Sequence, residues 1–129
     1  MTAEERPVRV VVADDEPDVR LLLEIQLTGD GFHVVGLAGD GRTAVDRCLQ
    51  HDADAVVMDL LMPTVSGFEA IAELQARMPR IGIVAYTAVA GEFVRAEMER
   101  LGIELVLKSG DVSKLAAALR RAADRAPTF

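Results

Sequence analysis

Four short apolar runs in this sequence each lead into a side chain that could take part in chemistry. These side chains are Asp14 and Asp15 after residues 8–13, Asp59 after residues 55–58, Thr87 after residues 81–86 and Lys108 after residues 103–107. Runs rich in Val, Ile and Leu are typical of buried strands in a parallel sheet. Because ligands bind outside the carboxyl ends of such strands, along one edge, we expect the five side chains to converge there.

The side chains that we expect at this edge suit one kind of chemistry. Three carboxylates within a few ångströms repel one another, and their pKa values rise unless a cation neutralises them. Oxygen ligands of this kind suit Mg²⁺, which keeps waters and phosphate oxygens in its other positions. A hydroxyl group and an ammonium group could bind the remaining oxygens of a phosphoryl group, and an aspartate can itself be the nucleophile. The pattern therefore predicts metal-assisted phosphoryl transfer onto Asp59, with Mg²⁺ as the cofactor.

Strand and helix patterns alternate strictly along the chain. Apolar runs predict strands at residues 8–13, 32–38, 54–60, 81–86 and 103–107. Helical spacing predicts helices that begin at Pro17 and after Asp40, and others at residues 68–78, 92–101 and 112–123. The fourth helix is mostly polar, and we expect Phe93, Met98 and Leu101 to be its buried positions. Five strand and helix pairs in alternation favour an α/β fold with helices on both faces of a parallel sheet.

Length, charge and cysteine content limit the function classes. At 129 residues the chain fits one domain, which we place at residues 8–125 between tails at 1–7 and 126–129. The net charge of -7 opposes binding to nucleic acid. No apolar run approaches the ~20 residues of a membrane span, and the N-terminus lacks a signal-peptide pattern, so we expect a cytoplasmic protein without membrane contact. Cys48 follows the apolar helical pattern and is expected to be an inert thiol.

The combined motifs resemble the receiver domain of response regulators. The resemblance covers roughly residues 8–124, in order and at the family's spacing. It depends on Asp14-Asp15, on Asp59-Leu60-Leu61-Met62-Pro63 with Gly67 four residues after the proline, on Thr87-Ala88 and on Lys108. It implies a flavodoxin-like (βα)5 three-layer sandwich with strand order 2-1-3-4-5.

The resemblance also implies a role for each matching residue. Asp59 corresponds to the phosphoacceptor, and Asp14 and Asp15 to the acidic pair that binds the metal together with the Leu61 backbone carbonyl. Thr87 corresponds to the switch hydroxyl and Lys108 to the lysine that pairs with the phosphoryl group. Such domains accept phosphate from a phosphohistidine on a sensor kinase or phosphotransfer protein. They signal, often as homodimers, through the face of the fourth helix, fifth strand and fifth helix.

The sequence departs from the family pattern near Lys108. Many receivers carry an aromatic residue three positions before the lysine, where this chain has Leu105, so the usual aromatic switch is in doubt. The usual proline after the lysine, with its cis bond, is replaced by Ser109, so the turn is expected to be trans or differently built. A Lys-Ser pair is similar to receivers of LuxR-type regulators. Either a stand-alone receiver or a segment of a longer protein would fit.

Two other functions compete with a phosphorylated switch. Phosphatases of the haloacid-dehalogenase kind also use an aspartate at a strand end with Mg²⁺, but they usually have a second carboxylate two residues later, where this chain has Leu61. A degenerate receiver that binds partners without phosphorylation is the second rival, and Leu105 and Ser109 keep it open.

The residues two positions past Asp59 and Thr87 bear on the lifetime of a phosphorylated state. These are Leu61 and Val89, and both are apolar. Neither side chain can orient an attacking water, so we expect slow self-dephosphorylation.

Overall fold

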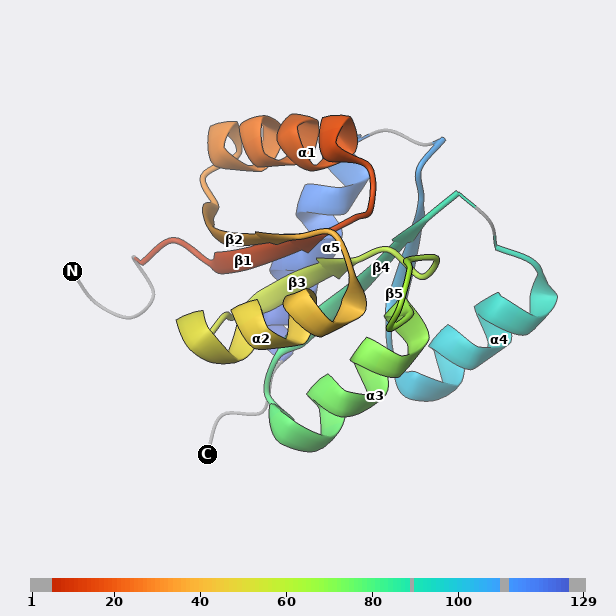
Figure 1. Cartoon of the computed structure of the whole chain (residues 1–129). Coiled ribbons are helices and arrows are strands. Elements are labelled where there is room, and N and C mark those ends of the chain that lie inside the picture. The colour runs from red at the N-terminus through yellow and green to blue at the C-terminus, as the bar shows by residue number, and fades with distance from the viewer. Residues whose placement is uncertain (1–5, 89, 110–111, 126–129) are drawn as a thin grey trace.

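The computed structural model of the protein describes residues 6–88, 90–109 and 112–125. Residues 1–5 and 126–129, which make up most of the two expected tails, lie outside the described residues. Strands and helices alternate along the chain as the sequence predicts (Figure 1). They are β1 (Arg9–Ala13), α1 (Pro17–Gly29), β2 (His33–Ala38), α2 (Gly41–His51), β3 (Ala55–Met58), α3 (Gly67–Arg77), β4 (Gly82–Thr87), α4 (Glu92–Leu101), β5 (Glu104–Leu107) and α5 (Val112–Arg125).

The strands form one parallel sheet in the order β2-β1-β3-β4-β5. The sheet is the middle layer of three: α1 and α5 cover one face, and α2, α3 and α4 cover the other (Figure 1). The predicted flavodoxin-like sandwich and its strand order are confirmed. This topology brings the carboxyl ends of β1, β3, β4 and β5 to one edge of the sheet.

The apolar strand sequences explain why the protein has a hydrophobic core on each face of the sheet. Successive residues of a strand point to opposite faces, so an uninterrupted Val-rich run fills both sides of the sheet. In β1, Val11 packs with α2 and α3, whereas Val10 and Val12 pack with α1 and α5. All residues of β3 and β4 are buried. The central strands are therefore rigid supports for whatever side chains follow them.

The ends of some elements differ from the predicted ones. The third strand was expected at residues 54–60, but β3 ends at Met58. The Asp59 N–H still donates to the Ala13 carbonyl at 2.9 Å, so pairing continues for one residue before the chain turns away. Helix α3 begins at Gly67, one residue early, because the Ser66 hydroxyl accepts a hydrogen bond from the Glu69 N–H in a capping box.

The expected burial of Phe93 in α4 is wrong. Its side chain is 78% exposed, whereas Met98 is fully buried and Val94 and Leu101 pack partly against the same core. Val94 and Leu101 lie four residues before and three residues after Met98, on one stripe of the helix. Phe93 lies about 140° around the helix from Met98 at 3.6 residues per turn, so it faces solvent. The helix packs mainly on β5.

Candidate functional site

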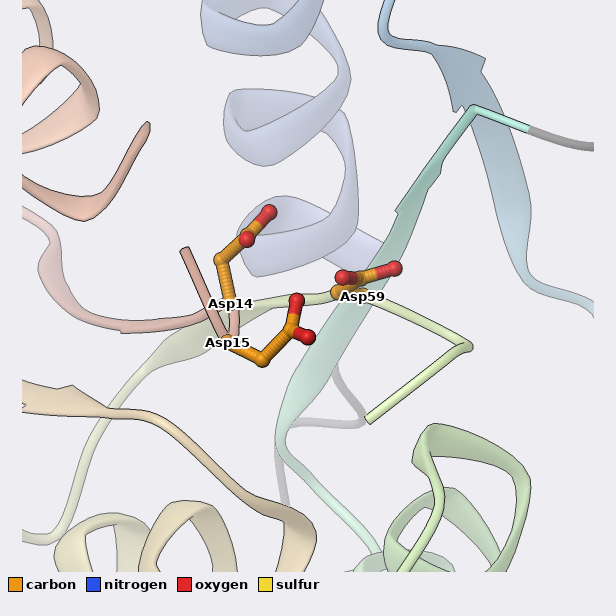
Figure 2. Close-up of side chains that lie close together, drawn as sticks. All are labelled: Asp14, Asp15 and Asp59. Atoms are coloured by element: carbon orange, nitrogen blue, oxygen red, sulfur yellow. The ribbon is translucent and has the colours of Figure 1, made fainter. Parts of the chain in front are cut away.

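The structure brings the sequence-predicted side chains together at the carboxyl edge of the sheet. Ala13 of β1 pairs in register with Met58 of β3, so the next residues, Asp14 and Asp59, are neighbours. Carboxylate oxygens of Asp14, Asp15 and Asp59 all lie within 4.8 Å of one another (Figure 2). Asp14 and Asp59 are 1% and 4% exposed, whereas Asp15 is exposed. The site therefore combines two desolvated carboxylates with one that solvent can reach.

The backbone around Asp14 fixes its carboxylate. Its N–H donates to the Ala38 carbonyl at 3.0 Å, and its carbonyl accepts from Arg20 Nη1 at 2.7 Å. Its Oδ1 accepts from the Glu16 N–H at 2.9 Å. Arg20 was not singled out from the sequence, although it lies only six residues after Asp14, at the end of the first turn of the helix that follows.

Asp59 is held by neighbours on both sides. Oδ1 accepts a hydrogen bond from the Leu61 N–H at 3.2 Å, and Oδ2 accepts one from Lys108 Nζ at 3.2 Å. Burial raises the pKa of Asp59; the Leu61 N–H and the Lys108 charge oppose that rise, and the Asp14 charge adds to it. The pKa of Asp59 is therefore raised overall. A nearby cation would lower this pKa by stabilising the charged carboxylate.

Lys108 is the cation that the described structure gives to these carboxylates. Its Nζ lies 2.6 Å from Asp14 Oδ2 and 3.2 Å from Asp59 Oδ2, and the Lys108 side chain is mostly buried. Burial opposes the charged form, but the carboxylates of Asp14 and Asp59 outweigh it, so the pKa of Lys108 is raised. The Lys108 N–H donates to the Thr87 carbonyl at 2.9 Å, which links the ends of β4 and β5.

The chemistry of this group fits a divalent cation. Asp14 Oδ2 is buried, and its close partner is the Lys108 ammonium group at 2.6 Å, which leaves further acceptor capacity on this oxygen. Three carboxylates with ligand atoms within 4.8 Å of one another, one of them with such capacity, are oxygen donors of the kind that Mg²⁺ prefers. The residues present therefore fit Mg²⁺, as the sequence predicted.

The Leu61 side chain projects to solvent beside the site and is 59% exposed. Thr87 is buried at the end of β4. Val89, the other residue expected to influence the lifetime of a phosphorylated state, lies outside the described residues.

The two departures from the family pattern have structural counterparts. Leu105 packs partly on the face of the sheet that α4 covers. Tyr86 is buried on the opposite face, and its ring centroid lies 5.9 Å from Lys108 Nζ. The aromatic side chain next to the lysine therefore comes from β4 and was missed, although it immediately precedes Thr87. Among the described residues no peptide bond is cis, so the turn from Lys108 to Ser109 is trans.

Cys48 lies on the buried side of α2, as the apolar helical pattern predicts. Its side chain is fully buried in α2, and burial raises the pKa of its thiol to about 12.

An open parallel sheet with an acidic cluster and a lysine at its carboxyl edge is the arrangement that the sequence motifs led us to expect. Residues 10–120 match the model of the response regulator receiver domain. The chain therefore belongs to the response regulator receiver domain family. Receiver domains generally bind Mg²⁺ at such an acidic cluster, interact with histidine kinases or phosphotransfer proteins, and are generally not enzymes in the usual sense.

Two relatives illustrate the range of the family. The transcriptional regulatory protein PdtaR of Mycobacterium tuberculosis is 34% identical over 121 residues, which cover 92% of this chain and 58% of PdtaR. The chemotaxis protein CheY of Thermotoga maritima is 30% identical over 114 residues, which cover 88% of this chain and 95% of CheY. The chain thus spans little more than half of PdtaR but nearly the whole of CheY.

Solved structures share the fold. The response regulator domain of CheB from Thermotoga maritima has a TM-score of 0.83 at 27% identity, covering 95% of this chain and all of that one. The receiver domain of the response regulator NarL from Mycobacterium tuberculosis has a TM-score of 0.86 at 24% identity, covering 93% and 98% of the two chains. In the part of the chain that the structure describes, every helix is too short or too polar to cross a bilayer.

Proposed function

We propose that this protein is a phosphorylation switch of two-component signalling, in which Asp59 accepts a phosphoryl group in the presence of Mg²⁺. The observation that carries the proposal is the cluster of three carboxylates with ligand atoms within 4.8 Å, two of them paired with Lys108. The function is that of an acceptor that changes state, not of an enzyme that turns over substrate.

Asp14, Asp15 and Asp59 are the side chains that would hold the ion, together with the backbone carbonyl of Leu61. When bound, Mg²⁺ neutralises the carboxylates and the phosphoryl oxygens, which lowers the barrier to transfer. Neutralisation also favours the ionised form of Asp59, whose pKa burial otherwise raises.

In the transfer step a carboxylate oxygen of Asp59 forms a bond to phosphorus while the bond between phosphorus and the nitrogen of a donor phosphohistidine breaks. The bonding electron pair stays on the imidazole of the donor, which takes up a proton from water. Lys108 Nζ, already 3.2 Å from Asp59 Oδ2, binds an oxygen of the transferred group. The Thr87 hydroxyl donates to another. The Lys108 N–H is hydrogen-bonded to the Thr87 carbonyl, so these contacts act on the ends of β4 and β5 as one unit. They would shift the conformational equilibrium of both strand ends in the same direction.

The exposed apolar side of α1 supports a protein as the phosphoryl donor. Leu21, Leu22 and Ile25 are all more than half exposed. Helix α1 begins two residues after Asp15, so a partner seated on these side chains would lie beside the acidic cluster. The proposed partner is a sensor histidine kinase or a phosphotransfer protein. A cytoplasmic location belongs to the same proposal.

The proposed output surface is the face of α4, β5 and α5, through which a homodimer would form. Phe93 offers an exposed aromatic side chain on α4, and the ion pair between Arg121 and Glu104, at 2.6 Å, joins α5 to β5. The net charge of -7 argues against direct contact of this domain with nucleic acid.

Leu61 and Val89 support slow self-dephosphorylation, because neither apolar side chain can orient an attacking water. Leu61→Asn should therefore shorten the lifetime of the phosphorylated state, and an unchanged lifetime would contradict this view.

The direct test is the intact mass of the protein after incubation with Mg²⁺ and acetyl phosphate. We expect one added phosphoryl group, lost in Asp59→Asn and without Mg²⁺, and retained in Asp46→Asn, which alters an exposed aspartate on α2. No mass gain, under conditions that modify another receiver, would contradict the proposal. It would favour the rival function, a receiver that binds partners without phosphorylation, for which Leu105 and Ser109 are the supporting departures.

A further inference from the structure

The turn between β2 and α2, at residues 39–41, contacts both segments that carry the acidic cluster, although it has no residue in that cluster. On the β1 side, the Ala38 carbonyl just before the turn accepts the Asp14 N–H at 3.0 Å. Arg20 Nη1, which donates to the Asp14 carbonyl, would lie 3.0 Å from a Cβ at Gly39. The turn thus lies directly against the segment that presents Asp14.

On the other side, the turn meets the β3–α3 loop at residues 59–66. The Gly41 N–H donates to the Val65 carbonyl at 2.9 Å. A Cβ at Gly41 would lie 2.2 Å from that oxygen and 2.8 Å from the Val65 carbonyl carbon. Both are backbone atoms, so no side chain could be accommodated at position 41 without displacing the loop.

Between Asp59 and α3, the β3–α3 loop is anchored near its start by the buried side chains of Leu60 and Met62, and the Gly67 N–H donates to the Leu60 carbonyl at 3.1 Å. The contact with Gly41 adds a restraint near the end of the loop, at Val65. The side chains of Leu61, Pro63 and Thr64 are exposed. Thr64 has a φ of 61°, a left-handed conformation that is unfavourable for a β-branched residue and persists only where its surroundings impose it. The loop is therefore held in a strained path, and its contact with Gly41 is one of the restraints that keep it there.

The Gly41 side of this contact is firmly fixed. Asp40 caps α2 by accepting hydrogen bonds from the Thr43 N–H at 2.8 Å and from the Thr43 hydroxyl at 3.1 Å. Ala44 and Val45, near the start of α2, are completely buried. The start of α2 can therefore act as a rigid stop for the loop.

We propose that Gly41 is a positioning residue for the metal site. By holding the Val65 carbonyl against the start of α2, it sets the position of the loop that carries Leu61 relative to Asp14 and Asp15. The inference rests on the proposed function for its consequence, which is Mg²⁺ affinity. Its structural part, the placement of the loop, is independent of any metal.

Three alanine variants separate this role from a general loss of packing. Gly41→Ala introduces the overlap with Val65. Gly82→Ala introduces an overlap of similar kind at the far end of the sheet, where a Cβ would lie 2.6 Å from the Ala122 carbonyl carbon of α5. Gly29→Ala places a methyl group in open space on α1. Amide ¹H–¹⁵N spectra, recorded without metal and then during a Mg²⁺ titration, report the loop position and the affinity together.

In Gly41→Ala we expect displaced Leu61 and Gly67 amide resonances without metal, and Mg²⁺ affinity at least fivefold weaker. Gly82→Ala should unfold at a lower temperature but keep both loop resonances and an affinity within twofold of the parent protein. Gly29→Ala should change neither. Unchanged loop resonances in Gly41→Ala, or displaced resonances with unchanged affinity, would overturn the proposal.

If Gly41→Ala does not fold, Val65→Gly tests the same contact, because it leaves the carbonyl in place but gives the loop backbone more freedom. We expect weaker Mg²⁺ binding at unchanged helix content; unchanged binding would overturn the proposal. If Mg²⁺ shifts no amide resonance of the parent protein, the result contradicts the proposed function instead. The positioning role would then be decided by the metal-free resonances of Leu61 and Gly67 alone.

Discussion

The two edges of the sheet differ in what they bury. The carboxyl edge holds Asp14 and Asp59 with a single lysine between them. At the amino edge, where β4 and β5 begin, the buried side chains are apolar ones such as Ile83 and Ile103. Burying a charge is unfavourable unless a partner offsets it, whereas burying apolar surface stabilises the fold. Among the described residues, the carboxyl edge therefore holds the buried charges, which a ligand can neutralise, and the opposite edge holds apolar side chains that stabilise the fold.

The largest effect should come from removing the cation at the site edge. Lys108→Met leaves Asp14 and Asp59 buried without their partner, and loss of one member of a buried ion pair costs about 3 kcal/mol. We expect a loss of this order in the unfolding free energy of the metal-free protein, measured by urea denaturation, and partial recovery with Mg²⁺. Lys114→Met, which alters an exposed lysine on α5, is the matched control. Equal stability of the two variants would mean that the two carboxylates do not depend on Lys108.

The next effect concerns access to the site edge from α1. Leu22→Glu puts a charge on the exposed apolar side of the helix, where it disturbs no buried contact. We expect phosphoryl transfer from a partner kinase to slow by about tenfold, equivalent to about 1.4 kcal/mol, while phosphorylation by acetyl phosphate is unchanged. Glu24→Gln on the same helix is the control. A parallel decrease with both donors would show that the variant damages the site and not the docking surface.

The pH dependence of stability should differ between the parent protein and Asp59→Asn. The folded-state pKa of Asp59 is raised above its usual 3.8, chiefly by burial. Below pH 3.8 the carboxyl is protonated in both the folded and unfolded states and carries no penalty; as pH rises through the folded-state pKa, the folded protein loses stability. Metal-free Asp59→Asn should therefore gain stability relative to the parent as pH rises through the folded-state pKa of Asp59. Denaturation at several pH values with a chelator measures this difference, and a difference that shrinks with pH would contradict the assigned direction.

The smallest effect should come from the strained residue of the β3–α3 loop. Thr64→Gly removes the penalty for a φ of 61° at a β-branched residue, but it also increases the freedom of the unfolded chain. We expect a net gain of about 0.5 kcal/mol in unfolding free energy, read from thermal unfolding beside Thr28→Gly, which alters an ordinary position in α1. A loss of stability at position 64 as large as at position 28 would mean that the loop stores no strain there.

The side chains at the strand ends could be predicted from the sequence because the pattern that marks each strand is local. The Val-rich runs before Asp14 and Asp59 specify buried parallel strands, and the parallel sheet then brings their carboxyl ends to one edge. Phe93 was misplaced because an apolar residue near a helix start can lie on either side of the buried stripe. Only the packing of Met98 into the core decides which side faces inward.

By itself the sequence determined the order of the elements, the fold and the residues available at the carboxyl edge. The tertiary structure alone decided how those residues are supported: Tyr86 beside Lys108, Arg20 on the Asp14 carbonyl, and Gly41 against Val65. The partners in the Lys108 and Gly41 contacts are more than twenty residues apart in the chain. Those contacts depend on strand register and on the path of the loop. Residue types and local spacing do not specify either of them for a single position.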